Sequence, residues 1–145
     1  MNLEGKSRMS MKAVVLAACA SLFLILSPAR AHHAFAAEFD IKAPVKLRGT
    51  VQKMEWVNPH SWIHIDVKGD DGTIVTWMVE GGSPNALLRL GFNKTALPPG
   101  SEVVVEGFQA RDGSKRAVGQ VVQFADGRRL FLGGSAPGAR GGGRE

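Results

Sequence analysis

Short segments of alternating apolar and polar residues constrain the fold of this chain more than any other feature of its sequence. In the first segment, Val45, Leu47 and Val51 fall on one face of an expected strand, with charged and polar residues on the other face. The apolar positions then change parity at Met54, which predicts a β-bulge or a strong bend near residues 52–53. We therefore expect a mostly β fold whose first strand curls sharply.

Four more strands are predicted, separated by turns rich in glycine, proline and aspartate: residues 61–68, 73–80, 102–110 and 115–124. After the third strand, Ser83 as N-cap and Pro84 at the first helical position predict a short helix that ends at Gly91. The small OB-fold has this order of elements: three strands with a bent first strand, then a helix, then two strands. We thus predict a five-stranded OB-like barrel with one short helix between strands 3 and 4, and a sandwich-like half barrel is the alternative.

Residues 1–31 have the composition of a secretory signal peptide. A basic leader is followed by an uncharged, mainly apolar run at 13–26 and by the small-residue triplet Ala29-Arg30-Ala31. The apolar run is too short for a membrane span, which needs about 20 residues. We expect cleavage after Ala31, a periplasmic or secreted mature protein, and no stable membrane span after processing.

The mature chain is expected to consist of an N-terminal arm at 32–44, a β-barrel domain at 45–132 and a disordered, glycine-rich tail at 133–145. The single cysteine, Cys19, lies in the leader, so the mature chain can form neither a disulfide nor a thiolate metal site. The leader also carries four basic residues and one acidic residue, so its removal lowers the net charge from +5 to +2. This balance argues against nucleic acid as a partner.

Several stretches of the mature chain resemble a family of small exported bacterial proteins of unknown function. They are HHAFAAEFD at 32–40, GTVQKMEWVNPHSWIHIDV at 49–67, GGSPNALLRLGF at 81–92 and PGSEVVVEGFQARDGSKRA at 99–117. The resemblance covers nearly all of the mature chain. It implies one exported domain, and it implies no activity, because none is established for the family.

The four histidines are the candidate metal ligands: His32, His33, His60 and His64. Cleavage after Ala31 makes His32 the first residue, which then offers its α-amine and a ring nitrogen to one ion, with His33 as an alternative donor. Nitrogen ligands of this kind suit Cu(II), which also has the highest affinity among the common divalent ions. The arrangement resembles copper sites of the histidine-brace kind in its first residue only, and a third nitrogen would come from His60 or His64.

Strand geometry separates two of these histidines. On a regular strand, His64 lies on the face opposite Ile63 and Ile65. Four residues of strand span about 13 Å, whereas two ring nitrogens that bind one ion must each lie within about 2.1 Å of it. His60 and His64 therefore share an ion only if the chain bends between them. In the structural alternative, both histidines are hydrogen-bonding groups without a ligand.

The sequence offers little for catalysis. Ser61 and its neighbour His60 point to opposite faces of a strand, Glu55 and Glu80 would pair only by accident of packing, and no phosphate-binding or dinucleotide motif is present. We therefore expect a binding module rather than an enzyme. One hypothesis is an exported Cu(II)-binding module that uses the terminal His32. The other is an interaction domain for a protein or a small ligand, in which the histidines are structural.

Overall fold

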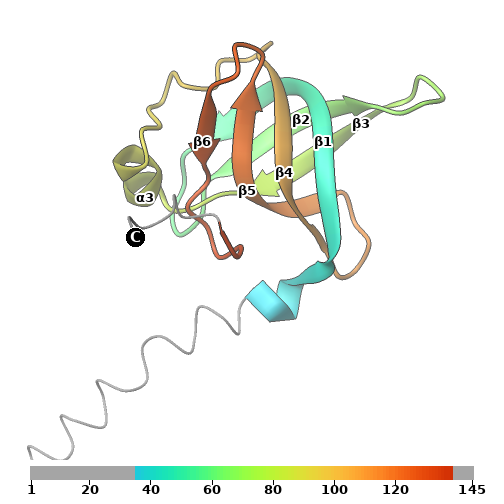
Figure 1. Ribbon diagram of the computed structural model, residues 1–145, viewed down its shortest axis with the longest axis horizontal. Coiled ribbons are helices and arrows are strands. Elements are labelled where there is room, and N and C mark those ends of the chain that lie inside the picture. The colour runs from blue at the N-terminus through green and yellow to red at the C-terminus, as the bar shows by residue number, and fades with distance from the viewer. Residues whose placement is uncertain (1–34, 139–145) are drawn as a thin grey trace, which may run out of the picture. The chain divides into compact units, whose positions relative to one another are not determined.

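The computed structural model describes residues 35–138, which form a helical turn at 35–38, six strands and the short helix α3 (Figure 1). The elements are β1 (Phe39–Glu55), β2 (Trp62–Lys68), β3 (Ile74–Glu80), α3 (Pro84–Arg89), β4 (Glu102–Ala110), β5 (Arg116–Phe124) and β6 (Arg129–Phe131). The fold is mostly β, as the alternating segments predict. The predicted signal peptide, and His32 and His33 after it, lie outside the described residues.

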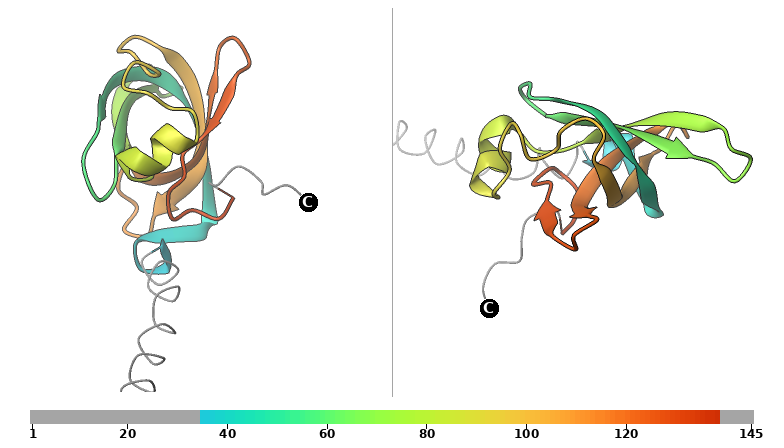
Figure 2. Two further views of the ribbon diagram at one scale, coloured as in Figure 1. Left: turned by 90° about the vertical axis from the view of Figure 1, so that its left-hand side faces the viewer. Right: turned by 90° about the horizontal axis from the view of Figure 1, so that it is seen from above.

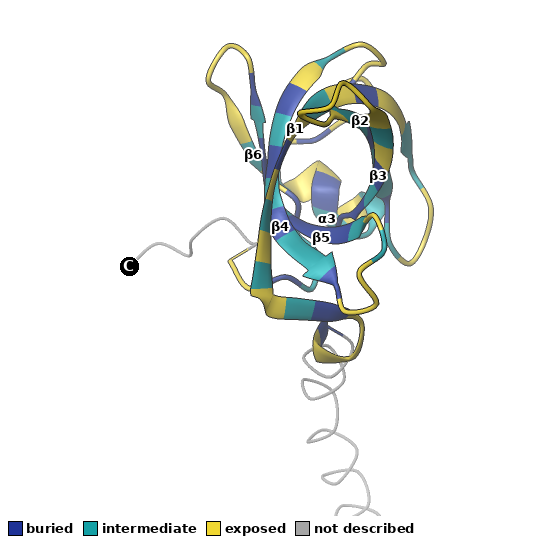
Figure 3. Ribbon diagram, turned by 90° about the vertical axis from the view of Figure 1, so that its right-hand side faces the viewer, coloured by how far each residue is buried: buried dark blue, intermediate teal, exposed yellow. Residues whose placement is uncertain are grey.

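The strands form one sheet in the order β3-β2-β1-β4-β5-β6, in which neighbours run antiparallel. A further, parallel pairing joins β3 to β5 and closes β1–β5 into a ring (Figure 3). We predicted five strands, and the described residues form six. The sixth strand exists because β3 pairs with β5 only at residues 116–118, which leaves the later part of β5 free to pair with residues 129–131.

Strand β1 belongs to both halves of the ring, because its earlier part pairs mainly with β4 and its later part with β2. The β1–β2 register shifts between Val51 and Lys53, so the bulge predicted near residues 52–53 is confirmed. Gly49 lies where the two pairings overlap. A Cβ atom at this position would lie 2.3 Å from the backbone oxygen of Asp66, so the close approach of the two strands requires glycine.

The main core fills the inside of the ring with the inward side chains of every strand from β1 to β5. Its members include Leu47, Val51, Ile63, Ile65, Trp77, Val79, Val105 and Val122. Helix α3 lies across one end of the ring (Figure 2, left) and buries Leu87 in this core. The predicted cap is confirmed, because the Ser83 hydroxyl accepts a hydrogen bond from the Ala86 amide at 3.3 Å. No helix within residues 35–138 has the length and apolar character that a membrane crossing requires.

A second, smaller apolar cluster packs on the outer side of the sheet, because Val118 points away from the face where its neighbour Ala117 joins the main core. The helical turn at 35–38 contributes Phe35, whose ring packs edge-on against Phe108 with 5.8 Å between centroids. Residues 35–38 thus pack on the sheet, and residues 39–44 of the predicted arm belong to β1.

Residues 133–138 belong to the segment that we expected to be a disordered tail. In the structure Ala136 is buried in the outer cluster beside Phe39 and Val118. The side-chain amide of Gln120 also donates a hydrogen bond to the Pro137 carbonyl. The glycine-rich composition of this segment does not predict the packing, because only one small apolar residue, Ala136, makes the contact with the outer cluster. Residues 139–145 lie outside the described part of the chain.

Replacing Ile65 tests the core that the ring encloses. Ile65 is fully buried, whereas Ile74, on the same β2–β3 hairpin, is 65% exposed. We expect Ile65→Ala to lower the free energy of unfolding by about 2–5 kcal/mol, because it removes buried methyl groups and leaves a cavity. The matched change Ile74→Ala should cost less than about 1 kcal/mol. Urea unfolding of both variants measures the difference, and equal losses would contradict the assignment of the core face.

Candidate functional site

His60 lies just before β2, after the cis peptide bond between Asn58 and Pro59. Its ring Nδ1 is 2.7 Å from Oε1 of Glu80, at the end of β3. A carboxylate oxygen at this distance favours the tautomer of the neutral ring that carries its proton on Nδ1. The Nε2 atom then carries the free lone pair. The His60 side chain is 42% exposed and that of Glu80 only 4%, so a buried carboxylate holds an accessible imidazole.

The surroundings of Glu80 mix both signs of charge. Burial is the main reason why the pKa of the Glu80 carboxyl is raised above its ordinary value, and the nearby carboxylate of Glu38 raises it further. The charges of His60 and Arg116 act in the opposite direction. The Arg116 guanidinium lies 3.6 Å from a Glu38 oxygen and 5.4 Å from the centroid of the Trp62 ring. Glu80 is thus the buried centre of a small polar cluster.

His64 has a different environment on the same strand. Ile63 and Ile65 are buried in the core, so the predicted phase of this strand is confirmed and His64 belongs to the outer face. Its side chain is only 12% exposed, and its Nε2 lies 3.3 Å from Oε1 of Glu55. That contact is not aligned as a hydrogen bond, and Nε2 has no hydrogen-bond partner among the described residues.

The structure places two of the four candidate ligands, His60 and His64, in separate environments. His60 contacts Glu80 at the end of β3, whereas His64 faces Glu55 at the end of β1. Within residues 35–138, no group of three or more histidine, cysteine, aspartate or glutamate side chains is arranged to hold a metal ion. His32 and His33 lie outside these residues.

Sequence reasoning missed the contact between Glu80 and His60, although a signal for it is present. The tight turn at 69–72 fixes the hairpin register, which pairs Lys68 with Ile74 and Trp62 with Glu80. That register places Glu80 at the start of β2, next to His60. The role of Arg116 had no such signal, because β5 reaches β3 only through the parallel pairing that closes the ring.

The chain belongs to DUF6152, a family of unknown function, whose model matches residues 20–120. This agrees with the resemblance to a family of unknown function that the sequence motifs indicate. Neither the curated proteins nor the solved structures contain a match to the chain. The family carries no activity to transfer, so only the chemistry of the site itself points to a function.

The protonation pattern of His60 is directly measurable. Neutral His60 should carry its proton on Nδ1, because a carboxylate oxygen 2.7 Å away favours an N–H over a lone pair at that atom. Long-range ¹H–¹⁵N correlation spectra of the imidazole rings distinguish the two tautomers. Glu80→Leu should remove the preference for the Nδ1–H form, whereas Glu38→Ala should retain it. An Nε2–H tautomer in the unmodified protein would contradict the assigned geometry.

Proposed function

We propose that this member of the DUF6152 family is an exported, non-catalytic binding module that takes up Cu(II) through histidine nitrogens. The contact between the exposed ring of His60 and the buried carboxylate of Glu80 carries the proposal. Metal-binding histidines commonly donate their second ring N–H to a carboxylate, which fixes the tautomer, orients the ring and makes the free nitrogen more basic. In His60, Nδ1 faces the Glu80 carboxylate at 2.7 Å, which leaves Nε2 as the donor for an ion.

The burial of Glu80 supports a functional role for the pair. Removing a carboxylate from water costs several kcal/mol unless partners compensate for the loss of solvation. Here the partner in contact is a half-exposed histidine, and the pKa of Glu80 stays raised, so the compensation is incomplete. A pair that only stabilised the fold would gain more from an apolar side chain at this position. We propose instead that the buried Glu80 carboxylate orients the His60 ring for a ligand.

A single imidazole does not make a selective copper site, so further donors are needed. We propose that the α-amine and the ring of His32 supply them after cleavage at Ala31, with His33 as the alternative donor. The set would then consist of nitrogen atoms, which Cu(II) prefers over the oxygen ligands typical of magnesium and calcium sites. His64 suits this role less well, because its Nε2 is covered and faces Glu55.

The proposal extends to the fold and the compartment. The ring order β1-β2-β3-β5-β4, with α3 after β3, supports an OB-like barrel as the fold. The basic and apolar leader supports export to the periplasm or the medium. Copper binding by a terminal amine depends on that export, because the signal peptidase creates the amine of His32.

Copper titration of the mature protein tests the site. Protein that begins at His32 should bind one Cu(II), with an affinity that falls as the pH drops through about 7.7 and 6.5, the ordinary pKa values of an α-amine and an imidazole. His60→Ala should weaken binding by about tenfold or more, and Glu80→Gln should weaken it by roughly 10-fold, the usual loss for the carboxylate partner of a ligand. Calorimetry with a competing chelator measures these affinities.

Two further variants complete that experiment. One additional alanine before His32 moves the amine away from the ring and should weaken binding markedly, whereas Trp77→Phe should leave the affinity unchanged. Equal affinity in the extended protein would eliminate the terminal donor, and equal affinity in His60→Ala would eliminate the imidazole donor. If both variants bind as the unmodified protein does, the histidines are structural and the interaction-domain hypothesis replaces the copper hypothesis.

Export and processing have their own test. Protein secreted from the full-length chain should begin at His32, because the Ala29-Arg30-Ala31 triplet is the expected cleavage signal. Intact-mass analysis of the periplasmic fraction and the medium measures the first residue. A mature chain that begins with an acylated Cys19 would overturn both the terminal-histidine site and the absence of a membrane anchor.

A further inference from the structure

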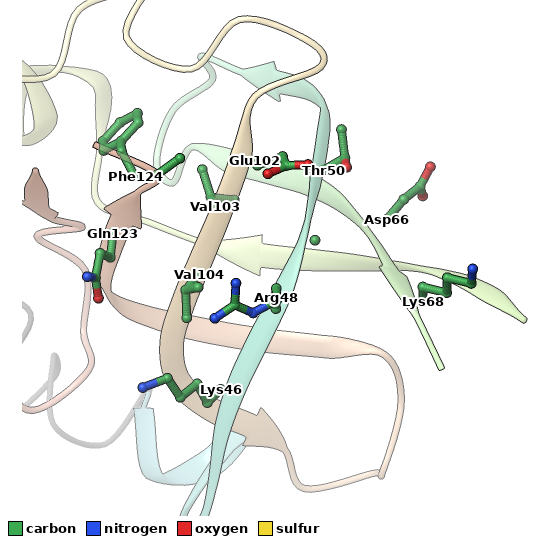
Figure 4. Close-up of a pocket in the computed structure, with 12 residues that line it drawn as sticks. Lys46, Arg48, Thr50, Asp66, Lys68, Glu102, Val103, Val104, Gln123 and Phe124 are labelled. Atoms are coloured by element: carbon green, nitrogen blue, oxygen red, sulfur yellow. The ribbon is translucent and has the colours of Figure 1, made fainter. Parts of the chain in front are cut away.

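A groove of ≈ 770 Å³ crosses the outer face of the sheet, over β2, β1, β4 and the end of β5 (Figure 4). Its size falls in the range of small-ligand sites, and only about half of its wall is apolar. The groove lies at the far end of β2 from His60. Asp66 and Lys68 line it, whereas the Glu80 cluster borders Trp62 at the start of that strand.

The strand register explains why these side chains meet. Thr50 on β1 pairs with Asp66 on one side and with Glu102 on the other. One step along the same outer face, Arg48 pairs with Val104, which in turn pairs with Gln123. Residues two positions apart on a strand point to the same side, so the groove combines a row of oxygen atoms with an adjacent row that contains a guanidinium.

The cations of the groove are not all neutralised by the protein. Lys46 pairs with Glu106 at 3.2 Å, but Arg48 and Lys68 form no ion pair with any of residues 35–138. Both are exposed. Arg48 lies in the middle of the group, with Lys46 and Lys68 on either side (Figure 4). The groove thus offers an unpaired guanidinium fork, which matches a planar carboxylate in two parallel hydrogen bonds.

The acidic side chains of the groove restrict which anions can enter. Hydrogen bonds from Thr76 and Gln52 hold the pKa of Asp66 below its ordinary value, so this group is a carboxylate at neutral pH. Glu102 is exposed on the opposite side of Thr50. Two carboxylates beside Arg48 weaken the binding of an anion that offers negative charge alone, because they repel it. They accept hydrogen bonds readily from hydroxyl groups, as the amide oxygen of Gln123 also does.

We propose that this groove binds an acidic saccharide, a sugar chain in which carboxylate groups alternate with many hydroxyls. Its carboxylate would pair with Arg48 and Lys68, and its hydroxyls would donate to Glu102, Asp66 and Gln123. A neutral sugar has no charge to pair with the Arg48 guanidinium. A simple carboxylate has no hydroxyl groups that could donate hydrogen bonds to Asp66 and Glu102. This site is independent of the proposed copper site, because the two share no residue.

Titration with tetragalacturonate, in metal-free buffer that contains a chelator, tests the proposal on the mature protein. Saturable binding is expected by calorimetry, with NMR shifts at the amides of Arg48, Thr50 and Gln123. Arg48→Gln should weaken binding by about tenfold, because it removes a charge-assisted pair. Arg89→Gln is the matched control on the exposed side of α3 and should bind as the unmodified protein does.

Two probes separate the parts of the ligand. Maltotetraose has the same number of sugars without the carboxylates, and citrate has carboxylates without the sugar ring, and both should bind at least about tenfold more weakly. The proposal is overturned if tetragalacturonate does not bind, if Arg48→Gln has no effect, or if either probe binds as tightly. His60→Ala should not change any of these affinities, so a failure of the copper proposal would leave this result interpretable.

Discussion

Strand β1 pairs with both β2 and β4, and the rest of the structure depends on this double pairing. Because its earlier part pairs with β4 and its later part with β2, β1 can join the two halves of a closed ring only if it curls, and two local features permit the curl. A bulge between Val51 and Lys53 increases the twist, and Gly49 lets the backbone of Asp66 approach where a side chain would not fit. The curl brings β3 to β5, the parallel pairing closes the ring, and the apolar faces of five strands then enclose one core.

Closure of the ring also completes the surroundings of the candidate functional site, whose His60–Glu80 contact comes from the β2–β3 hairpin. Glu80 pairs with Val118 across the parallel contact, so Arg116 on β5 and Glu38 before β1 lie close enough to influence its charge. Without closure, Glu80 would be an ordinary residue at the end of a hairpin. The polar groove lies over the middle of β1, where the outward residues of four strands meet. The ring thus buries apolar side chains inside and gathers polar ones outside.

Parts of the site were accessible to sequence reasoning and parts were not. The outward position of His64 follows from the alternation with Ile63 and Ile65, and the structure confirms it. The inference that His60 and His64 have separate environments follows from the rise of a strand. The partners of these histidines did not follow, because each is a glutamate on another strand. A periodic pattern specifies a face, but it does not name the side chain that comes to lie beside it.

The sequence by itself determined the strands, the bulge in β1, the cap of α3 and the inward faces of the core, because these depend on neighbours a few residues apart. Backbone conformation, turn chemistry and alternation act at that range. The tertiary structure decided the sixth strand, the packing of Phe35 and Ala136 outside the ring, the pairing of His60 with Glu80 and the groove around Arg48. Phe35, Ala136 and the groove bring together segments far apart in the chain. The sixth strand and the His60–Glu80 contact join hairpin neighbours, and the ring decides which part of β5 stays free and how deeply Glu80 is buried.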